Sequence, residues 1–203
     1  MSNKVYDNID DAFNYLYYII TTQGKKVIDQ RGDIVYQIPF VALHFEDHIN
    51  DFGYAKAVKV PKNTFFNNEG LQKYADQLLD GNIHDFVYTY GNRLIEYFDV
   101  DQYQVMIDRL KEDENTRRAI AITYDPQTDT YLEDIPCLIM IKCSIYQRQL
   151  EMTVIFRSND IRYAFPSNMY ALMTVQLYVA DKLGIKPGRF HYVGLDAHWK
   201  GDE

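Results

Sequence analysis

The chain of 203 residues is 47% hydrophobic and 15% aromatic, which is typical of a globular protein and excludes a disordered chain. Its formal net charge of −8 argues against a nucleic-acid partner, because proteins that bind duplexes normally present a basic face. Two cysteines are too few for a disulfide framework and suit a reducing cytoplasm. The polar start differs from a signal peptide, and no apolar run could cross a bilayer. We therefore expect a single domain over residues 1–203, located in the cytoplasm, with no membrane or nucleic-acid partner.

The first two thirds of the chain contain helical and strand-like patterns in turn. Residues 8–22 have one apolar face and are followed by Gly24, which predicts an amphipathic helix and its end. Residues 26–45 are rich in β-branched residues and predict strands around a turn at 30–33. Further along we expect a polar break at 47–68, helices near 69–80 and 101–113, and a strand at 118–124, while residues 88–98 fit neither pattern.

The last third has the clearest pattern. Residues 137–147 and 150–157 predict an antiparallel hairpin, with Pro136 at the start of its first strand. Ser167-Asn168 is expected to open a helix that runs to Lys182 and is apolar on most of its circumference, so it should lie in the core. A strand at 189–196 follows. The predicted fold class is α+β, a mixed or antiparallel sheet with a central buried helix.

Cys137 is the candidate nucleophile. A cysteine attacks as its thiolate, so a catalytic cysteine needs positive charge nearby, and Arg157 on the second strand of the hairpin could supply it. The alternative is that Cys137 is only a small buried apolar residue. Cys143, six residues further on, is expected on the same strand face without a comparable motif.

Two groups of cationic residues could bind an anion. Arg157 and the hydroxyl of Ser158 offer donors in a geometry that suits phosphate, and Arg117-Arg118 form a second pair. The alternative is that these arginines are solvated or paired with acids. Asn168 offers an acceptor beside a donor, which complements the N3–H and O4 of uracil. Its alternative role is to cap the helix that it opens.

These residues belong to motifs whose order resembles one enzyme family. Pro-Cys is followed, 20 residues after the cysteine, by Arg-Ser-x-Asp, then by Pro-x-Asn and Asp-x-His, and is preceded by Tyr-Gly and a double arginine. In this chain the motifs are Tyr90-Gly91, Arg117-Arg118, Pro136-Cys137, Arg157-Ser158-Asn159-Asp160, Pro166-Ser167-Asn168 and Asp196-Ala197-His198. The set resembles thymidylate synthases, in particular the short form of methanogenic archaea, from about residue 82 to 199.

The resemblance implies a thymidylate-synthase-like fold and the reductive methylation of dUMP to dTMP. Its carbon and hydride would come from 5,10-methylene-tetrahydrofolate or methylene-tetrahydromethanopterin, without a metal. Cys137 would add to C6 of the pyrimidine, which is covalent catalysis. The expected substrate-binding residues are Arg31, Arg117, Arg118, Arg157, Ser158, Asn159, Asp160, Asn168 and His198, and Asp160 and Tyr90 would contact the cofactor.

The resemblance also implies which part of the substrate each of these residues contacts. Arg157 and Ser158 would hold the phosphate, with Arg31 from a short match at 30–33. Arg117 and Arg118 would come from the partner subunit of a homodimer. Asn168 would read uracil, and His198 would touch the sugar hydroxyl.

The chain also departs from the family pattern. Lys200 stands where a tyrosine is usual, and no catalytic glutamate aligns, which leaves Glu46, Glu69 and Asp76 as candidates. Two other functions therefore stay open. One is a pyrimidine-nucleotide hydroxymethylase, in which water captures the intermediate that hydride would reduce. The other is a nucleotide-binding homologue without catalytic activity.

Overall fold

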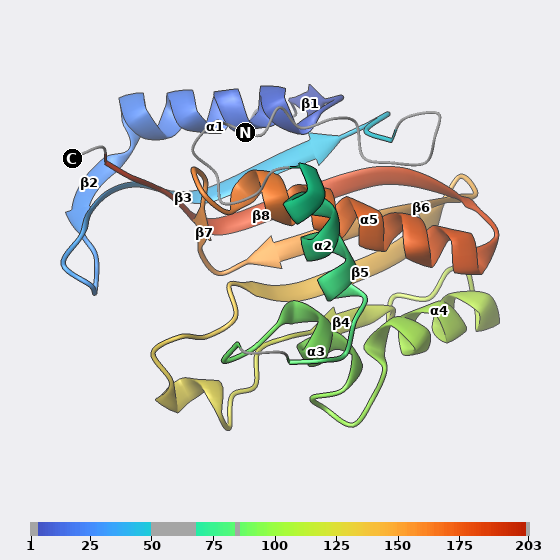
Figure 1. Cartoon of the computed structure of the whole chain (residues 1–203). Helices are drawn as coiled ribbons and strands as arrows, with labels where there is room; N and C mark the ends of the chain where they lie inside the picture. Colours follow the sequence, from blue (N-terminus) through green and yellow to red (C-terminus); the bar gives the residue numbers. More distant parts are fainter. Residues whose placement is uncertain (1–3, 50–67, 84–85, 202–203) are drawn as a thin grey trace.

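The structure is a computed structural model that describes residues 4–49, 68–83 and 86–201 (Figure 1). Most of the predicted polar break at 47–68 lies outside these ranges. The described strands are β1 (Val5–Tyr6), β2 (Lys25–Ile28), β3 (Ile34–Phe45), β4 (Ile120–Ile122), β5 (Leu138–Tyr146), β6 (Gln149–Phe156), β7 (Asn159–Asp160) and β8 (Lys186–Lys200). The described helices are α1 (Ile9–Gln23), α2 (Asn68–Leu78), α3 (Tyr90–Ile95), α4 (Gln102–Glu112) and α5 (Phe165–Leu183), with a 3₁₀ turn at Asp129–Tyr131.

The described strands form one mixed sheet in the order β1-β3-β8-β6-β5-β4, with β2 paired to β3 and β7 to β8. Strands β6 and β8 are parallel, whereas β8 is antiparallel to β3 and β6 to β5. A parallel pair needs a crossover connection, and α5 supplies it between β6 and β8. The α+β class with a mixed sheet is therefore confirmed, while the single domain over residues 1–203 stays a prediction.

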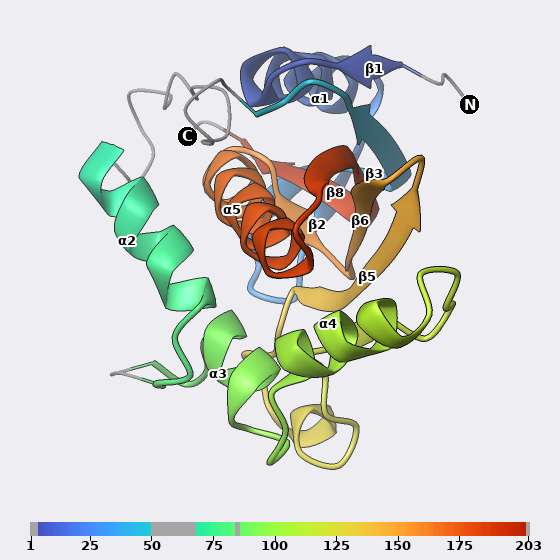
Figure 2. The same ribbon diagram turned by 90° about the vertical axis from the view of Figure 1, so that its right-hand side faces the viewer.

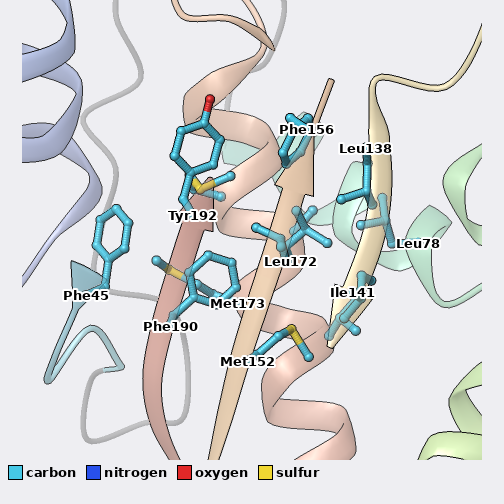
Figure 3. Close-up of a cluster of buried hydrophobic side chains, with 14 of the residues drawn as sticks. Phe45, Leu78, Leu138, Ile141, Met152, Phe156, Leu172, Met173, Phe190 and Tyr192 are labelled. Carbon is cyan, nitrogen blue, oxygen red and sulfur yellow. The ribbon is translucent and has the colours of Figure 1, made fainter. Parts of the chain in front are cut away.

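Helix α5 is the centre of the core, as its apolar sequence predicted. Twelve of its 19 residues are buried, and the exposed ones are Asp181 and Lys182 near its end. The core side chains of β6 and β8 lie against it, among them Met152, Phe156 and Phe190 (Figure 3). Gly184 ends the helix in the left-handed conformation with a φ of 67°, which a side chain would strain.

The start of α5 was predicted two residues too late. Phe165 and Pro166 form its first turn, because proline lacks the amide hydrogen that a first-turn residue leaves unused. Asn168 therefore lies inside the helix, where its backbone N–H donates to the carbonyl of Ala164. No side chain caps this helix, so the capping role considered for Asn168 is wrong.

The hairpin of β5 and β6 is confirmed, with two differences at its ends. Its turn is at Gln147-Arg148, one residue earlier than predicted, and both residues have positive φ as a tight two-residue hairpin turn requires. Strand β5 begins at Leu138, so Pro136 and Cys137 precede it. The pairing is irregular between Leu138 and Met140, and this bulge changes which residues point inward.

The bulge separates the environments of the two cysteines. Leu138 and Ile141 are both fully buried although they are three residues apart. Even spacing therefore does not imply a shared face here, and the expectation that Cys137 and Cys143 share one is wrong. Cys143 is fully buried in the core, whereas Cys137 is partly exposed.

The other predicted elements are present with boundaries shifted by a few residues. Residues 88–98, which fitted neither pattern, contain α3, and Thr89 caps it by accepting a hydrogen bond from the N–H of Asn92. Strand β8 extends well beyond the predicted 189–196. In the part of the chain that is described, no helix is both long and apolar enough to cross a membrane.

A buried ion pair joins α3 to the segment that leads to Cys137. Arg93 and Asp129 are 3% and 1% exposed, and both terminal nitrogens of the arginine donate to the carboxylate, at 3.2 and 2.6 Å. The planar guanidinium also lies over the ring of Tyr97, 3.9 Å from its centre. Both terminal nitrogens of the arginine and both oxygens of the carboxylate are paired, so the ion pair fixes α3 relative to residues 123–137.

The sheet face opposite α5 carries an apolar row that no described helix covers (Figure 2). Along β6, Met152, Val154 and Phe156 are buried while Thr153 and Ile155 between them stay partly exposed. Strand pairing aligns one residue from each of five strands in this row, and none of them is buried: Ile122, Met140, Ile155, Val193 and Ala42.

Candidate active site

A cavity of about 1050 Å³ lies where the β2–β3 loop, α2, α3, the start of α5 and the ends of the central strands meet. Its volume lies just above the usual range for small-molecule sites, about 300–1,000 Å³, so it could hold two ligands side by side. Nine of the residues that the sequence singled out line it: Arg31, Tyr90, Cys137, Arg157, Ser158, Asn159, Asp160, Asn168 and His198. They come from six different parts of the chain, so the fold gathers the motifs at one place.

Two of the arginines that the sequence predicted as substrate-binding residues do not line this cavity. Arg117 and Arg118 follow α4, just before the edge strand β4, and their side chains are exposed. The carbonyl of Arg118 accepts a hydrogen bond from Arg109, which orders this connection. Within one copy of the chain, these arginines cannot act with Arg157.

Arg157 holds the segment that carries Cys137. Its Nε donates to the carbonyl of Pro136 at 2.9 Å, and its Nη2 donates to the carbonyl of Ile135 at 2.8 Å. The same Nη2 lies 3.5 Å from Sγ of Cys137. In addition, the backbone N–H of Arg157 donates to the carbonyl of Cys137 at 2.8 Å. The thiol is therefore fixed beside a permanent positive charge.

Two opposing effects set the pKa of the Cys137 thiol. Burial raises the pKa because the thiolate loses hydration, and the positive charge of Arg157 lowers it, with a smaller contribution of the same sign from Arg31. Burial dominates, so the pKa stays above that of a free thiol. At Cys143 burial outweighs the opposing charge of Lys142 and raises the pKa to about 12. The two thiols therefore differ in that the guanidinium of Arg157 lies beside Cys137 and stabilises its thiolate.

Strands β7 and β8 bring the next motif residues together. Pairing places Asn159 opposite Ala197 and Asp160 opposite His198. The hydroxyl of Ser158 lies 3.2 Å from Nδ1 of His198, and Asp160 accepts a hydrogen bond from the backbone of Tyr163. Residues that are about 40 positions apart in the sequence therefore form one polar wall of the cavity.

The side-chain amide of Asn168 is held by two neighbours. Tyr74 on α2 donates its hydroxyl to Oδ1 at 2.7 Å, and Nδ2 donates to Oδ1 of Asn159 at 3.3 Å. The sequence did not single out Tyr74. It lies beside Leu71, Ala75 and Leu78 on the inward face of α2, and this helical spacing could have marked it as an inward-facing polar group.

Two further tyrosines line the cavity beside Cys137. Tyr90 accepts a hydrogen bond from the N–H of Leu138 at 3.2 Å, and Tyr88 donates to the carbonyl of Ile135 at 3.3 Å. Helix α3 can approach α2 closely because Gly91 has no side chain, since a Cβ there would run into the carbonyl oxygens of Gln77 and Asp80. Burial raises the pKa of both tyrosines, so their hydroxyls stay neutral.

None of the three carboxylates proposed for acid–base work lines the cavity. Glu46 pairs with Arg189, Glu69 pairs with Lys73 on the surface, and Asp76 accepts a hydrogen bond from Gln72. Among the described residues, the carboxylates that line it are Asp29, Asp33, Glu133, Asp134, Asp160 and Asp196. Burial raises the pKa of Asp196, and its buried Oδ1 has no hydrogen-bond partner within the described ranges.

Lys200, which departs from the family pattern, fastens the loop that carries Arg31. Its ammonium pairs with Asp33 at 2.5 Å, and the carboxylate of Asp29 accepts the backbone N–H groups of Arg31 and Asp33. Asp33 and the other acidic neighbours raise the pKa of Lys200, which keeps its positive charge. The cationic groups at this end of the cavity are therefore Arg31 and Lys200.

The cavity has the donors and shape for an anionic ring-bearing ligand. Among the residues that the structure describes, no group of three or more His, Cys, Asp and Glu side chains could hold a metal ion. Arg157 lies at Cys137, and Arg31 and Lys200 lie at the β2–β3 loop, while Asn168 and the tyrosines present neutral hydrogen-bonding groups. This arrangement can bind a phosphate at one side, a polar heterocycle over the thiol, and a second ring beside it.

The comparisons with known proteins agree with this geometry. Residues 54–200 match the family model described as thymidylate synthase. A protein of Methanosarcina mazei named "Putative thymidylate synthase" is 37% identical over 193 residues, which cover 94% of this chain and 86% of that protein. Proteins of the same name from Methanothermobacter marburgensis and Methanocaldococcus jannaschii are 32% and 34% identical over 200 residues, covering 95% and 94% of this chain and 90% and 87% of theirs.

The opposing effects on Cys137 predict how its alkylation depends on pH. Because its pKa lies above the ordinary value of 9.0, the rate of iodoacetamide modification should still increase above pH 9. Arg157→Gln removes the charge that stabilises the thiolate, so this variant should react more slowly at each pH. Cys143 is an internal control that should stay unmodified while the protein is folded.

Peptide mapping by mass spectrometry measures both sites. A rate at Cys137 that reaches its plateau below pH 8, or faster modification in Arg157→Gln, would contradict the proposed electrostatics.

Proposed function

Since the chain belongs to the thymidylate synthase family, we propose that it converts dUMP to dTMP, with a methylene-tetrahydropterin donating both the one-carbon unit and the hydride. Members of this family bind dUMP and use a methylene-folate co-substrate. The observation that carries the proposal is the contact between the thiol of Cys137 and the guanidinium of Arg157 in the wall of a large cavity.

The chemistry begins at Cys137. Its thiolate adds to C6 of the pyrimidine, and the electrons move to C5, which becomes a carbon nucleophile. C5 bonds to the methylene carbon of the pterin and then loses its proton. The bond from this carbon to the pterin nitrogen breaks, which leaves an exocyclic methylene group. Hydride from the tetrahydropterin reduces that group to methyl, and the thiolate leaves as the C5–C6 double bond forms again.

The phosphate of dUMP is proposed to bind at the same guanidinium that contacts the thiol. We place the phosphate at Arg157, Ser158 and Arg31, where charge-assisted hydrogen bonds are strong. Arg157 uses Nε and Nη2 to hold the carbonyls of Pro136 and Ile135, and its Nη1 is the proposed donor to the phosphate. Substrate binding and thiol activation then depend on one side chain.

The remaining residues fit the rest of the two ligands. Asn168 is proposed to pair with N3–H and O4 of uracil, and His198 with a hydroxyl of the deoxyribose. Asp160 and Tyr90 are proposed to contact the pterin. Tetrahydrofolate and tetrahydromethanopterin both carry a pterin ring, and both stay open as the donor. The cytoplasmic location expected from the sequence also stays a prediction.

A second copy of the chain is the proposed partner for the uncovered sheet face. An apolar row crosses five strands of this face and consists of Ile122, Met140, Ile155, Val193 and Ala42. A partner surface of similar length would remove these side chains from water. Arg117 and Arg118 lie beside this face, at the edge strand β4, and point to no group of their own cavity. In a twofold dimer they would be placed to reach the phosphate in the partner's cavity.

The product of the reaction tests the proposed function. We expect incubation with dUMP and each methylene-tetrahydropterin to give a nucleotide in which one hydrogen is replaced by a methyl group. Mass analysis of the nucleotide measures this directly. A hydroxymethyl group would show that water captures the intermediate and would favour the hydroxymethylase. Binding of dUMP without any product from either donor would favour the homologue without catalytic activity.

Mixing two inactive variants tests the shared site. Cys137→Ala and the double variant Arg117→Ala, Arg118→Ala should each be inactive alone, because each lacks one half of every site. After subunit exchange, half of the dimers should be mixed, and each mixed dimer should hold one complete site. Activity should therefore recover to about a quarter of the native value.

Sedimentation should show a dimer for the native protein and for each variant. Exchange without recovery of activity, or a native protein that is an active monomer, would contradict the shared arginines.

A further inference from the structure

A chain of hydrogen bonds crosses the inner wall of the cavity from α2 to β8. Tyr74 donates to Oδ1 of Asn168 at 2.7 Å, Nδ2 of Asn168 donates to Oδ1 of Asn159 at 3.3 Å, and Nδ2 of Asn159 donates to the hydroxyl of Tyr192 at 3.4 Å. Asn159 and Asn168 are 2% and 5% exposed, so water competes little for these groups. The first three members line the cavity.

A side-chain amide alone cannot distinguish uracil from cytosine. Uracil offers N3–H beside an acceptor at O4, and it pairs with an amide oxygen beside an amide N–H. Cytosine offers an acceptor at N3 beside an amino group, and it pairs with the same amide after rotation by 180°. A freely rotating Asn168 would therefore accept both bases. Discrimination needs something that holds the amide in one orientation.

The hydrogen-bond chain provides that restraint. Rotation of the Asn168 amide alone would place its Oδ1 against Oδ1 of Asn159, and two acceptors repel each other. Both amides would have to rotate together, and Tyr74 would lose its acceptor. Each end of the Asn168 amide still has one free position, a lone pair on Oδ1 and one N–H on Nδ2. These two positions suit uracil.

We propose that Tyr74 is a specificity-determining residue, which selects a uracil base by fixing the amide of Asn168 through the chain that continues to Asn159. Tyr74 acts as a positioning residue, since its hydroxyl contacts Asn168 and not the base. Burial keeps its phenol neutral, because it raises the pKa well above physiological pH, so the donor is always present. The inference rests on the proposed function, because it assumes a pyrimidine nucleotide in the cavity.

The test compares the affinities of dUMP and dCMP in the full-length protein by isothermal titration calorimetry. The native protein should prefer dUMP. Tyr74→Phe keeps the ring and removes the hydroxyl, and the ratio of the two affinities should fall about fivefold to tenfold, the loss expected for one buried hydrogen bond. Asn159→Leu removes the acceptor of the next bond, and the ratio should fall in the same direction.

Tyr170→Phe is the matched control. Its hydroxyl donates to Oε1 of Gln72 at 3.0 Å, so it is another tyrosine bond between α2 and α5, but it does not line the cavity. The control should leave the ratio unchanged. Circular dichroism and thermal unfolding should show that each variant is folded, and Asn159→Leu provides the test if Tyr74→Phe is not.

Each outcome has a separate meaning. A native preference for dUMP with an unchanged ratio in folded Tyr74→Phe would overturn this inference and leave the proposed function intact. An equal loss of affinity for both nucleotides would also overturn it, because it would show a purely structural role. A native protein that binds neither nucleotide would overturn the proposed function, and this inference with it.

Discussion

The site depends on the guanidinium of Arg157. It bonds to the carbonyls of Pro136 and Ile135 and lies 3.5 Å from the sulfur of Cys137, so one side chain holds the reactive segment and supplies its positive charge. The pKa of the thiol is nevertheless raised, because burial outweighs this charge. In the proposed reaction the same guanidinium therefore serves both the thiol of Cys137 and the phosphate of the substrate.

The fold explains how distant motifs reach this guanidinium. Helix α5, which connects β6 to β8, carries Asn168 near its start. Strand pairing brings Asp160 opposite His198. Helix α2 then closes the cavity with Tyr74, and the buried pair of Arg93 and Asp129 fixes the wall beside Cys137. Helices and strands thus carry Tyr90, Asn159, Asp160, Asn168 and His198, which favours precise placement of a ligand.

The sequence predicted what depends on local pattern and on the combined motifs. The hairpin, the apolar helix α5 and the residues that gather around Cys137 were all expected. Other features were missed, because they depend on details of the backbone or on how the elements pack. A bulge after Leu138 separated the faces of Cys137 and Cys143, and Pro166 moved the start of α5. Packing also directed Tyr74 into the cavity, while the carboxylates considered for catalysis, such as Glu69, lie outside it.

The central claim is that Cys137 bonds to C6 of dUMP and so activates C5. Release of hydrogen from C5 of labelled dUMP measures this step without depending on the later hydride transfer. The account predicts release by the native protein, and no release by Cys137→Ala, which should still bind dUMP within a few-fold of the native affinity. Release that persists in Cys137→Ala would contradict the covalent mechanism.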